Sequence, residues 1–179
     1  DAHLLLLAQI DVDRDDPYAS SDCDTIPMSL AGADLAALRV AVTTDFGVCP
    51  VDRKIAELFK RRMKGVGAAF AAMEWETPDF AGVHDVFDAH RGLALLIGHR
   101  ERYAAHRDKL GPNIIDDVER GMALTADAIA RAHIEQQKLY KRFNAFFDTF
   151  DVIIAPAAAV SPFPHAERAM MAINGKPLD

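Results

Sequence analysis

The chain has 179 residues, of which half are hydrophobic and 26% are charged, and its net charge at pH 7 is −7. This composition is typical of a globular protein with a core of its own, and the acidic balance argues against a surface for nucleic acid or anionic membranes. No stretch reaches the roughly 18 uninterrupted apolar residues of a membrane span, so no membrane partner is expected.

The first 37 residues predict the end of a helix followed by an acidic loop. Residues 1–10 carry an apolar patch, Leu4 to Leu7, but they lack the basic start and the cleavage site of a signal peptide. Residues 11–24 are rich in aspartate, and the loop continues through Pro27 and Gly32. This part therefore predicts little regular structure after its first helix.

A strand, a helix and a second strand are predicted next. Apart from Arg39, residues 38–42 are apolar and include two β-branched valines, and they are followed by polar turn residues. Asp52 is a good N-cap for a helix with an apolar stripe, and residues 70–75 form a second short apolar run. Such a βαβ unit predicts a parallel strand pair. The members of the stripe are Ile55, Leu58, Phe59, Met63, Val66 and Phe70.

Three further helices and a third strand follow. A long helix is expected over 83–105, a shorter one over 114–124, and a third that begins after the capping residue Thr125. The four uncharged residues 152–155 are followed by Pro156, which predicts a buried strand over 151–155 around which the other layers pack. The long helix should bury Val86, Phe87, Leu93, Leu96 and Ile97, and the last helix should bury the aromatic stripe Tyr140, Phe143 and Phe147.

The predicted fold class is therefore α/β, with a βαβ unit and further helices packed on a mixed, mostly parallel sheet. All 179 residues are expected to form a single partial domain. Within it, residues 1–37 are the helix end and acidic loop, 38–160 the α/β core, and 161–179 an irregular tail. No internal repeat is present.

Short polar motifs give no convincing catalytic or metal site. The pair Ser20-Ser21 lacks flanking glycines and a nearby base, and a polar turn is the better interpretation. Asp11, Asp13 and Asp15 match the first ligands of a calcium loop, but the required glycine and glutamate are absent. The run 65–70 begins like a dinucleotide fingerprint, but it follows a helix instead of a strand.

Histidines and cysteines add no site either. His84 shares a helix face with Asp88, and two groups do not make a metal site. Cys23 and Cys49 are far apart and no Cys-x-x-Cys occurs, so free thiols in a reducing cytoplasm are expected. No cofactor is predicted.

Five segments, in order, resemble the amidase signature family of serine hydrolases and amidotransferase A subunits. They are DAHLLLLAQIDVDRDDPYAS at the start, LRVAVTTDFGVCPVDRKIAELFKRRM, MEWETPDF, LGPNIIDDVERGMALTADAIARAH and FDTFDVIIAPAAAVSPFPH. The resemblance implies a lysine that deprotonates a first serine, which activates a second serine beside backbone oxyanion donors. None of these groups maps onto this sequence, so no catalytic residue is assigned. The resemblance implies an internal segment of a larger enzyme.

The same resemblance suggests which residues face substrate. The family's middle region lines the acyl or amine pocket, which makes Val118, Gly121, Met122, Thr125 and Pro156 the pocket candidates, with helix packing as the alternative for each. The chain has Ala-Pro-Ala at 155–157 where the family usually has Thr-Pro-Thr, so a polar role there is not expected. The apolar candidates favour an apolar or aryl acyl group.

Two functions remain open from the sequence. The first is the scaffold and substrate-pocket segment of an amidase that cleaves a small-molecule C–N bond through an acyl-serine, inert by itself. Its partners are the remainder of the amidase chain and a small amide, with no nucleic acid and with a homodimer as a further option. The alternative is a self-contained α/β module for ligand or protein binding without hydrolase activity.

Overall fold

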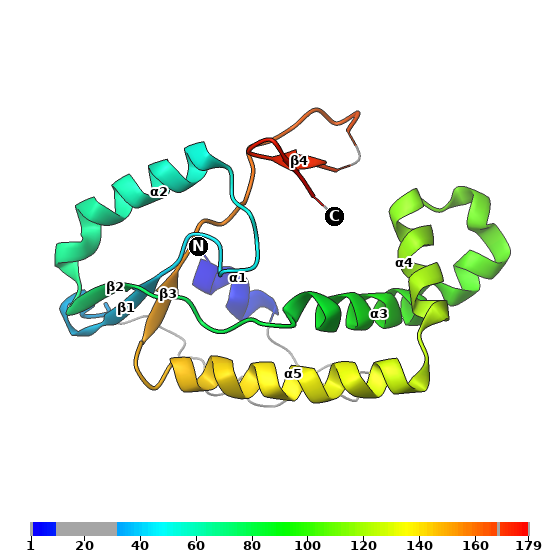
Figure 1. Cartoon of the computed structure of the whole chain (residues 1–179), viewed down its shortest axis with the longest axis horizontal. Helices are drawn as coiled ribbons and strands as arrows, with labels where there is room; N and C mark the ends of the chain where they lie inside the picture. Colours follow the sequence, from blue (N-terminus) through cyan, green and yellow to red (C-terminus); the bar gives the residue numbers. More distant parts are fainter. Residues whose placement is uncertain (1, 10–31, 168, 179) are drawn as a thin grey trace. The chain divides into compact units, whose positions relative to one another are not determined.

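The computed structural model describes residues 2–9, 32–167 and 169–178. The chain divides into two compact units, residues 1–34 and 35–179, which are considered separately. In the first unit, helix α1 (Ala2–Gln9) confirms the helix expected at the start, and Leu4, Leu5 and Leu6 are exposed in it (Figure 1). The acidic loop with the serine pair, the aspartate run and Cys23 lies outside the described residues. The single-domain assignment stays a prediction.

The second unit is built on a three-stranded parallel sheet. Strands β1 (Arg39–Val42), β2 (Ala72–Trp75) and β3 (Val152–Ile154) lie in the order β2-β1-β3, and both outer strands run parallel to β1. Val40 pairs with Met73 on one side and with Val152 on the other. The predicted α/β class with a mostly parallel sheet is confirmed.

The centre of the sheet is β1, which corrects the expectation that residues 151–155 form the buried organising strand. Val40, Ala41 and Val42 are completely buried, whereas every residue of β3 is only half-buried. The difference arises from position, because β1 has a strand on each side and β3 has one neighbour within the described residues. A short β-branched run predicts a strand, but it does not tell a central strand from an edge strand.

Helix α2 (Arg53–Val66) connects β1 to β2, as expected for a βαβ unit. The side chain of Asp52 caps it by accepting a hydrogen bond of 2.8 Å from the backbone N–H of Lys54. A short 3-10 turn, Gly67–Ala69, follows the helix before β2 begins. The predicted cap and helix are therefore confirmed, while no residue of α2 is fully buried.

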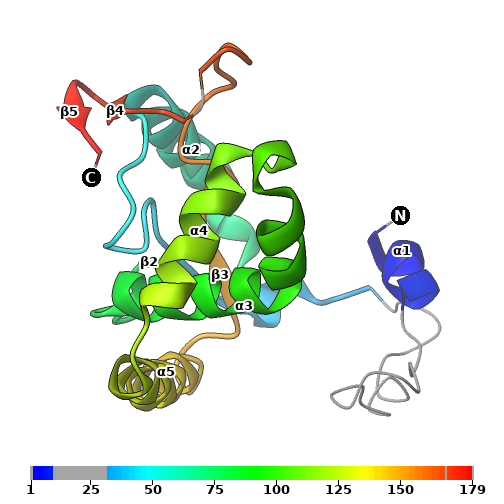
Figure 2. The ribbon, with the colours of Figure 1, turned by 90° about the vertical axis from the view of Figure 1, so that its right-hand side faces the viewer.

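Helices α3 (Val83–His106), α4 (Pro112–Ala123) and α5 (Ala126–Phe146) confirm the three helices expected between β2 and β3. Short 3-10 turns lie at Leu35–Ala37 and Arg107–Lys109. Helices α3 and α5 lie side by side, and α4 packs on α3 (Figure 2). Thr125 caps α5 as predicted, because its hydroxyl accepts a 3.1 Å hydrogen bond from the N–H of Ala128.

The contact between α3 and α4 is unusually close. A Cβ atom at Gly121 would lie 2.2 Å from the carbonyl oxygen of Gly92, so the two helices touch backbone to backbone at these glycines. Val86 and Val118 are buried near this contact region, on α3 and α4. Small residues let helices approach in this way, and both glycines are therefore packing positions.

Four of the apolar side chains expected in the core are exposed, namely Phe87, Ile97, Tyr140 and Phe147. Phe87 is 56% exposed and Ile97 is 76% exposed on α3, and Tyr140 on α5 also faces outward. Both helices therefore carry apolar side chains on a face that no other described element packs against. Helical spacing predicts which side chains share a face, but it does not say which face meets a neighbour.

The tail contains a small antiparallel hairpin where an irregular segment was expected. Strands β4 (Ala172–Ile173) and β5 (Lys176–Pro177) are joined by Asn174 and Gly175, both with positive φ. The Asn-Gly pair is the strongest local signal for such a turn, and it was present in the sequence. None of the helices in the described part of the chain is long and apolar enough to cross a membrane.

Candidate functional site

The carboxyl ends of the three strands meet at one edge of the sheet, where parallel α/β proteins bind their ligands. Thr43 follows β1 directly and is 2% exposed, and its hydroxyl lies 2.9 Å from the hydroxyl of Thr77, which follows β2. The N–H of Thr43 donates to the carbonyl of Ile154 at 3.1 Å. This hydrogen-bonded threonine pair therefore fixes the ends of all three strands relative to one another.

The loop after β1 is shaped by a tight turn. Phe46 and Gly47 both have positive φ, the N–H of Phe46 donates to the Thr43 hydroxyl, and the N–H of Gly47 donates to the carboxylate of Asp45. The ring of Phe46 packs edge-on against Phe80, with 5.7 Å between centroids, and Phe80 stacks on Phe143 of α5. The aromatic contacts join the carboxyl edge of the sheet to α5.

An apolar hollow lies beside the loop that follows β3. It measures about 340 Å³ and is closed on one side by α2. We call it the Pro156 hollow; its lining residues are Ile55, Leu58, Phe59, Arg62, Pro156, Ala157 and Ala158. The N–H of Asp52 donates to the carbonyl of Ala159 at 2.8 Å, which holds this loop against the start of α2.

The tail hairpin also holds the start of α2. The side-chain oxygen of Asn174 accepts a hydrogen bond of 2.9 Å from the N–H of Arg53, and its amide nitrogen donates to the carbonyl of Val51 at 2.9 Å. The first amides of a helix have no partner within the helix, so Asn174 and the Asp52 cap satisfy two of them. The sequence analysis missed this contact, which spans 121 residues between Asn174 and Arg53.

A second, charged hollow of about 490 Å³ lies among α3, α4 and α5. Its charges are largely paired, because Arg120 contacts Asp88 at 3.3 Å and Arg131 contacts Asp127 on its own helix. The His84 side chain is hydrogen-bonded to the carbonyl of Val48 at 2.9 Å. The lining residues are Asp85, Val86, Asp88, Ala89, Arg120, Leu124, Ala128, Arg131, Ala132 and Glu135.

The pocket candidates from the sequence are distributed over two places. Val118, Gly121 and Met122 belong to α4, where Val118 is completely buried, Gly121 touches α3, and Met122 is 49% exposed. The hydroxyl of Thr125 is used in capping α5. Pro156 lies apart from these in sequence and lines the hollow beside α2. The assignment of these five residues to a substrate pocket stays a prediction.

Two further ion pairs join α3 and the 3-10 turn that follows it to α4. The guanidinium of Arg91 contacts the nearly buried carboxylate of Asp117 at 2.8 Å. Farther along, Arg107 and the hydroxyl of Tyr103 both donate hydrogen bonds of 2.7 Å to Glu119, and these bonds lower the pKa of Glu119, that from Arg107 most. The carboxylates of Asp117 and Glu119 are each paired with an arginine that holds them in place, so we assign them a structural role.

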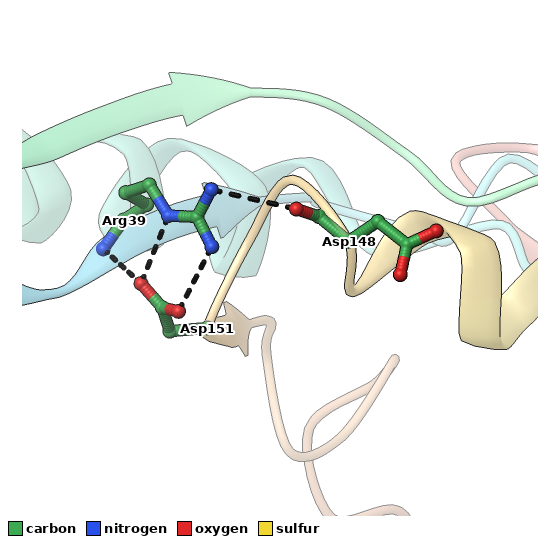
Figure 3. Close-up of polar contacts among 3 residues, drawn as sticks. All are labelled: Arg39, Asp148 and Asp151. Carbon is green, nitrogen blue, oxygen red and sulfur yellow. Dashed lines mark hydrogen bonds and ion pairs between the residues drawn. The ribbon is translucent and has the colours of Figure 1, made fainter.

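At the amino end of the sheet, Arg39 and Asp151 form a bidentate pair (Figure 3). The guanidinium donates at 3.0 and 3.2 Å, and the backbone N–H of Arg39 donates to the same carboxylate at 2.8 Å. Hydrogen bonds from the Arg39 side chain, and next from its backbone, hold the pKa of Asp151 below its usual 3.8. Asp148 offers Arg39 only its backbone carbonyl, at 3.5 Å, and its own carboxylate points away.

Asp151→Asn is expected to reduce the free energy of unfolding at pH 7, because the folded state holds the ionised carboxylate more firmly than the unfolded chain does. That contribution is complete above the unfolded-state pKa of 3.8 and is lost as the pH falls through the lower folded-state pKa. The difference between variant and wild type should therefore shrink in acid, as measured by urea unfolding between pH 7 and pH 2. Asp148→Asn is the control, and an equal effect of both substitutions would contradict the assignment.

In the residues that the structure describes, no group of three or more His, Cys, Asp or Glu side chains is arranged to hold a metal ion. Cys49 is an exposed free thiol in the loop between β1 and α2. The rings of His90 and His133 lie 4.7 Å apart between α3 and α5, without a third ligand type beside them.

Comparison with known proteins identifies the fold. No family model and no curated protein matches the chain. A solved bacterial aryl acylamidase of the amidase signature family is similar over 82% of this chain and 33% of its own, with 19% identity and a TM-score of 0.67. A solved amidase is similar over 78% of this chain and 32% of its own, with 18% identity and the same TM-score. The chain thus has the fold of about a third of these enzymes.

Proposed function

We propose that this chain is the scaffold and substrate-pocket segment of an amidase-type hydrolase. The observation that carries the proposal is the structural likeness, which covers 82% of this chain but only 33% of the aryl acylamidase. Five segments that resemble the same family in the sequence support it independently. Residues 38–160 in particular hold both the parallel sheet and the loops at its carboxyl edge.

The reaction proposed for the whole enzyme is cleavage of a small-molecule amide through an acyl-serine. An activated serine hydroxyl attacks the carbonyl carbon, the amine leaves with a proton, and water then hydrolyses the ester to release the acid and restore the serine. Ser161 is the single serine among the described residues, and no lysine donates a hydrogen bond to it. The reactive groups are therefore proposed to come from polypeptide other than these residues.

The segment is proposed to contribute the walls of the substrate pocket, while the reactive groups come from elsewhere. The threonine pair at 43 and 77 sets the ends of the strands, and the Pro156 hollow provides an apolar wall beside them. Binding energy from such walls orients a substrate against reactive groups supplied elsewhere, which is where much of the rate enhancement of an enzyme arises. An apolar or aryl acyl group suits these walls best.

The test compares two proteins. The 179-residue chain should not hydrolyse p-nitroacetanilide above the buffer background. The absorbance of released p-nitroaniline measures the hydrolysis. The complete protein encoded by the gene that contains this chain should hydrolyse p-nitroacetanilide, and a sulfonyl fluoride should stop the reaction by sulfonylating one serine hydroxyl with loss of fluoride. Mass spectrometry identifies that serine. Turnover by the chain alone, or an inactive complete protein over a panel of aryl and alkyl amides, would refute the proposal.

A further inference from the structure

Helix α2 carries a charge opposite to that of the rest of the chain. It contains six basic residues and one acidic residue, Glu57, in 14 positions, whereas the whole chain has a net charge of −7. All six basic side chains are exposed. A basic amphipathic helix in an acidic protein indicates a surface that meets something negative.

The charges gather on one side of the helix. Successive residues of an α-helix are rotated by about 100°, which places five of the basic residues within an arc of about 120° opposite the apolar stripe. This α2 basic face consists of Arg53, Lys54, Lys60, Arg61 and Lys64. Arg62 lies at its border, next to Leu58, and both residues line the Pro156 hollow.

None of these cations has an ion-pair partner within the described residues. The ion pairs there use Arg39, Arg91, Arg107, Arg120, Arg131, Lys138 and Arg142, all of which lie on other elements. Arg100 and Arg102 on α3 also lack such a partner, but α2 is distinguished by the number of its cations, because it carries six basic residues and one carboxylate within 14 positions. Glu57 lies in the middle of the face and offsets one charge of six.

The apolar side of α2 is turned towards the protein. Phe59 packs edge-on against Trp75 of β2, with 6.0 Å between ring centroids, and Ile55 and Phe59 face the loop at Pro156 across the hollow. A helix that lies on a membrane buries its apolar face in lipid, which this packing prevents. The outward surface is instead cationic, with one apolar hollow at its margin.

We propose that the α2 basic face binds an acidic segment of another polypeptide. The carboxylates of that segment face the cations along the helix, whose 14 residues span about 21 Å. One apolar side chain of the segment enters the Pro156 hollow, beside Arg62 and the 44%-exposed Leu58. Charge complementarity speeds and selects the encounter, and the hollow gives the apolar anchor that interfaces of this kind require.

The experiment titrates the 179-residue chain with a synthetic helical peptide of Glu, Leu and Ala, and with the same peptide carrying Gln in place of Glu. Trp75 is the single tryptophan of the chain, and its contact with Phe59 at the hollow makes its fluorescence the readout. The acidic peptide should bind, and raising the salt from about 50 to about 500 mM should weaken binding by about tenfold or more, because the charges are exposed. The Gln peptide should not bind.

Paired charge reversals locate the surface. Arg61→Glu with Lys64→Glu should weaken binding about tenfold or more, whereas Arg100→Glu with Arg102→Glu, which changes the net charge equally on exposed positions of α3, should leave it unchanged. Leu58→Asp should weaken binding through the hollow. Circular dichroism tests whether each variant is folded. If the Arg61→Glu, Lys64→Glu variant is unfolded, Arg61→Gln with Lys64→Gln is used in its place.

Four results would overturn the proposal. They are absence of binding, binding of both peptides alike, equal loss in the α3 control, and preferential binding of vesicles containing phosphatidylserine over the acidic peptide. A salt-sensitive dimer in sedimentation, lost in the α2 reversal, would show that the occupant is a second copy of this chain and would replace the proposed partner. None of these results depends on amide hydrolysis.

Discussion

Gly121→Ala is expected to lower the free energy of unfolding by about 3 kcal/mol, which makes it one of the two most disruptive single changes considered for this protein. The added Cβ would lie 2.2 Å from the carbonyl oxygen and 2.8 Å from the carbonyl carbon of Gly92, and 2.9 Å from the Cβ of Leu96. Backbone atoms of a helix cannot move aside as a flexible side chain does. Helix α4 must therefore shift away from α3, and the ion pair between Arg91 and the nearly buried Asp117 is disturbed with it.

The matched control is Gly98→Ala in the interior of α3, where an added Cβ meets nothing within 4 Å. That change should raise the free energy of unfolding by about 0.5 to 1 kcal/mol, because alanine has the higher helix propensity. Urea unfolding followed by far-ultraviolet circular dichroism measures both variants. If Gly121→Ala were as harmless as Gly98→Ala, the backbone contact between α3 and α4 would not exist as described.

Val118→Asp is expected to cost about 4 kcal/mol, because it buries a carboxylate without a partner at a position with no exposure to solvent. The side chain lies on α4 beside the nearly buried Asp117, whose negative charge adds to the penalty. The loss should diminish in acid, since an aspartate buried in this way is less unfavourable when it is protonated. Thermal and urea unfolding at pH 7 and pH 4 measure both effects.

Met122→Asp serves as the control for this second change. Met122 lies one turn after Val118 on the same helix and is 49% exposed, so its replacement should alter the free energy of unfolding by no more than about 0.5 kcal/mol. The two variants also separate packing from substrate contact. In the complete protein, for which we propose amidase activity, a higher KM of Met122→Asp with unchanged stability would support a pocket role for Met122, and equal KM values would argue against it.

Local signals in the sequence predicted the elements of the fold well. Asp52 and Thr125 cap their helices as expected, because a capping side chain needs only amides two or three residues away. The β-branched run before Thr43 became β1 for a similar reason. The predicted parallel pairing followed from the single helix between two short strands.

Features that depend on distant residues were not predictable in the same way. The Thr43–Thr77 hydrogen bond joins residues 34 apart and depends on the register of two parallel strands. The hydrogen bond between Asn174 and the N–H of Arg53, at the start of α2, joins residues 121 apart. The Asn-Gly turn itself was visible in the sequence. The exposure of Phe87 and Ile97 depends on which face of α3 meets a neighbour, and a helical period carries no such information.

The order of the strands has a consequence for biosynthesis. The middle strand leaves the ribosome before both of its neighbours, and the partner on its open side follows only after the 112 residues that separate Arg39 from Asp151. At about 5 to 20 residues per second, the edge of β1 that pairs with β3 stays unpaired for roughly 5 to 20 s during translation. Nascent chains of this protein are therefore good clients for chaperones that shield unpaired strands, and slowing elongation within α3 to α5 should lengthen that exposure.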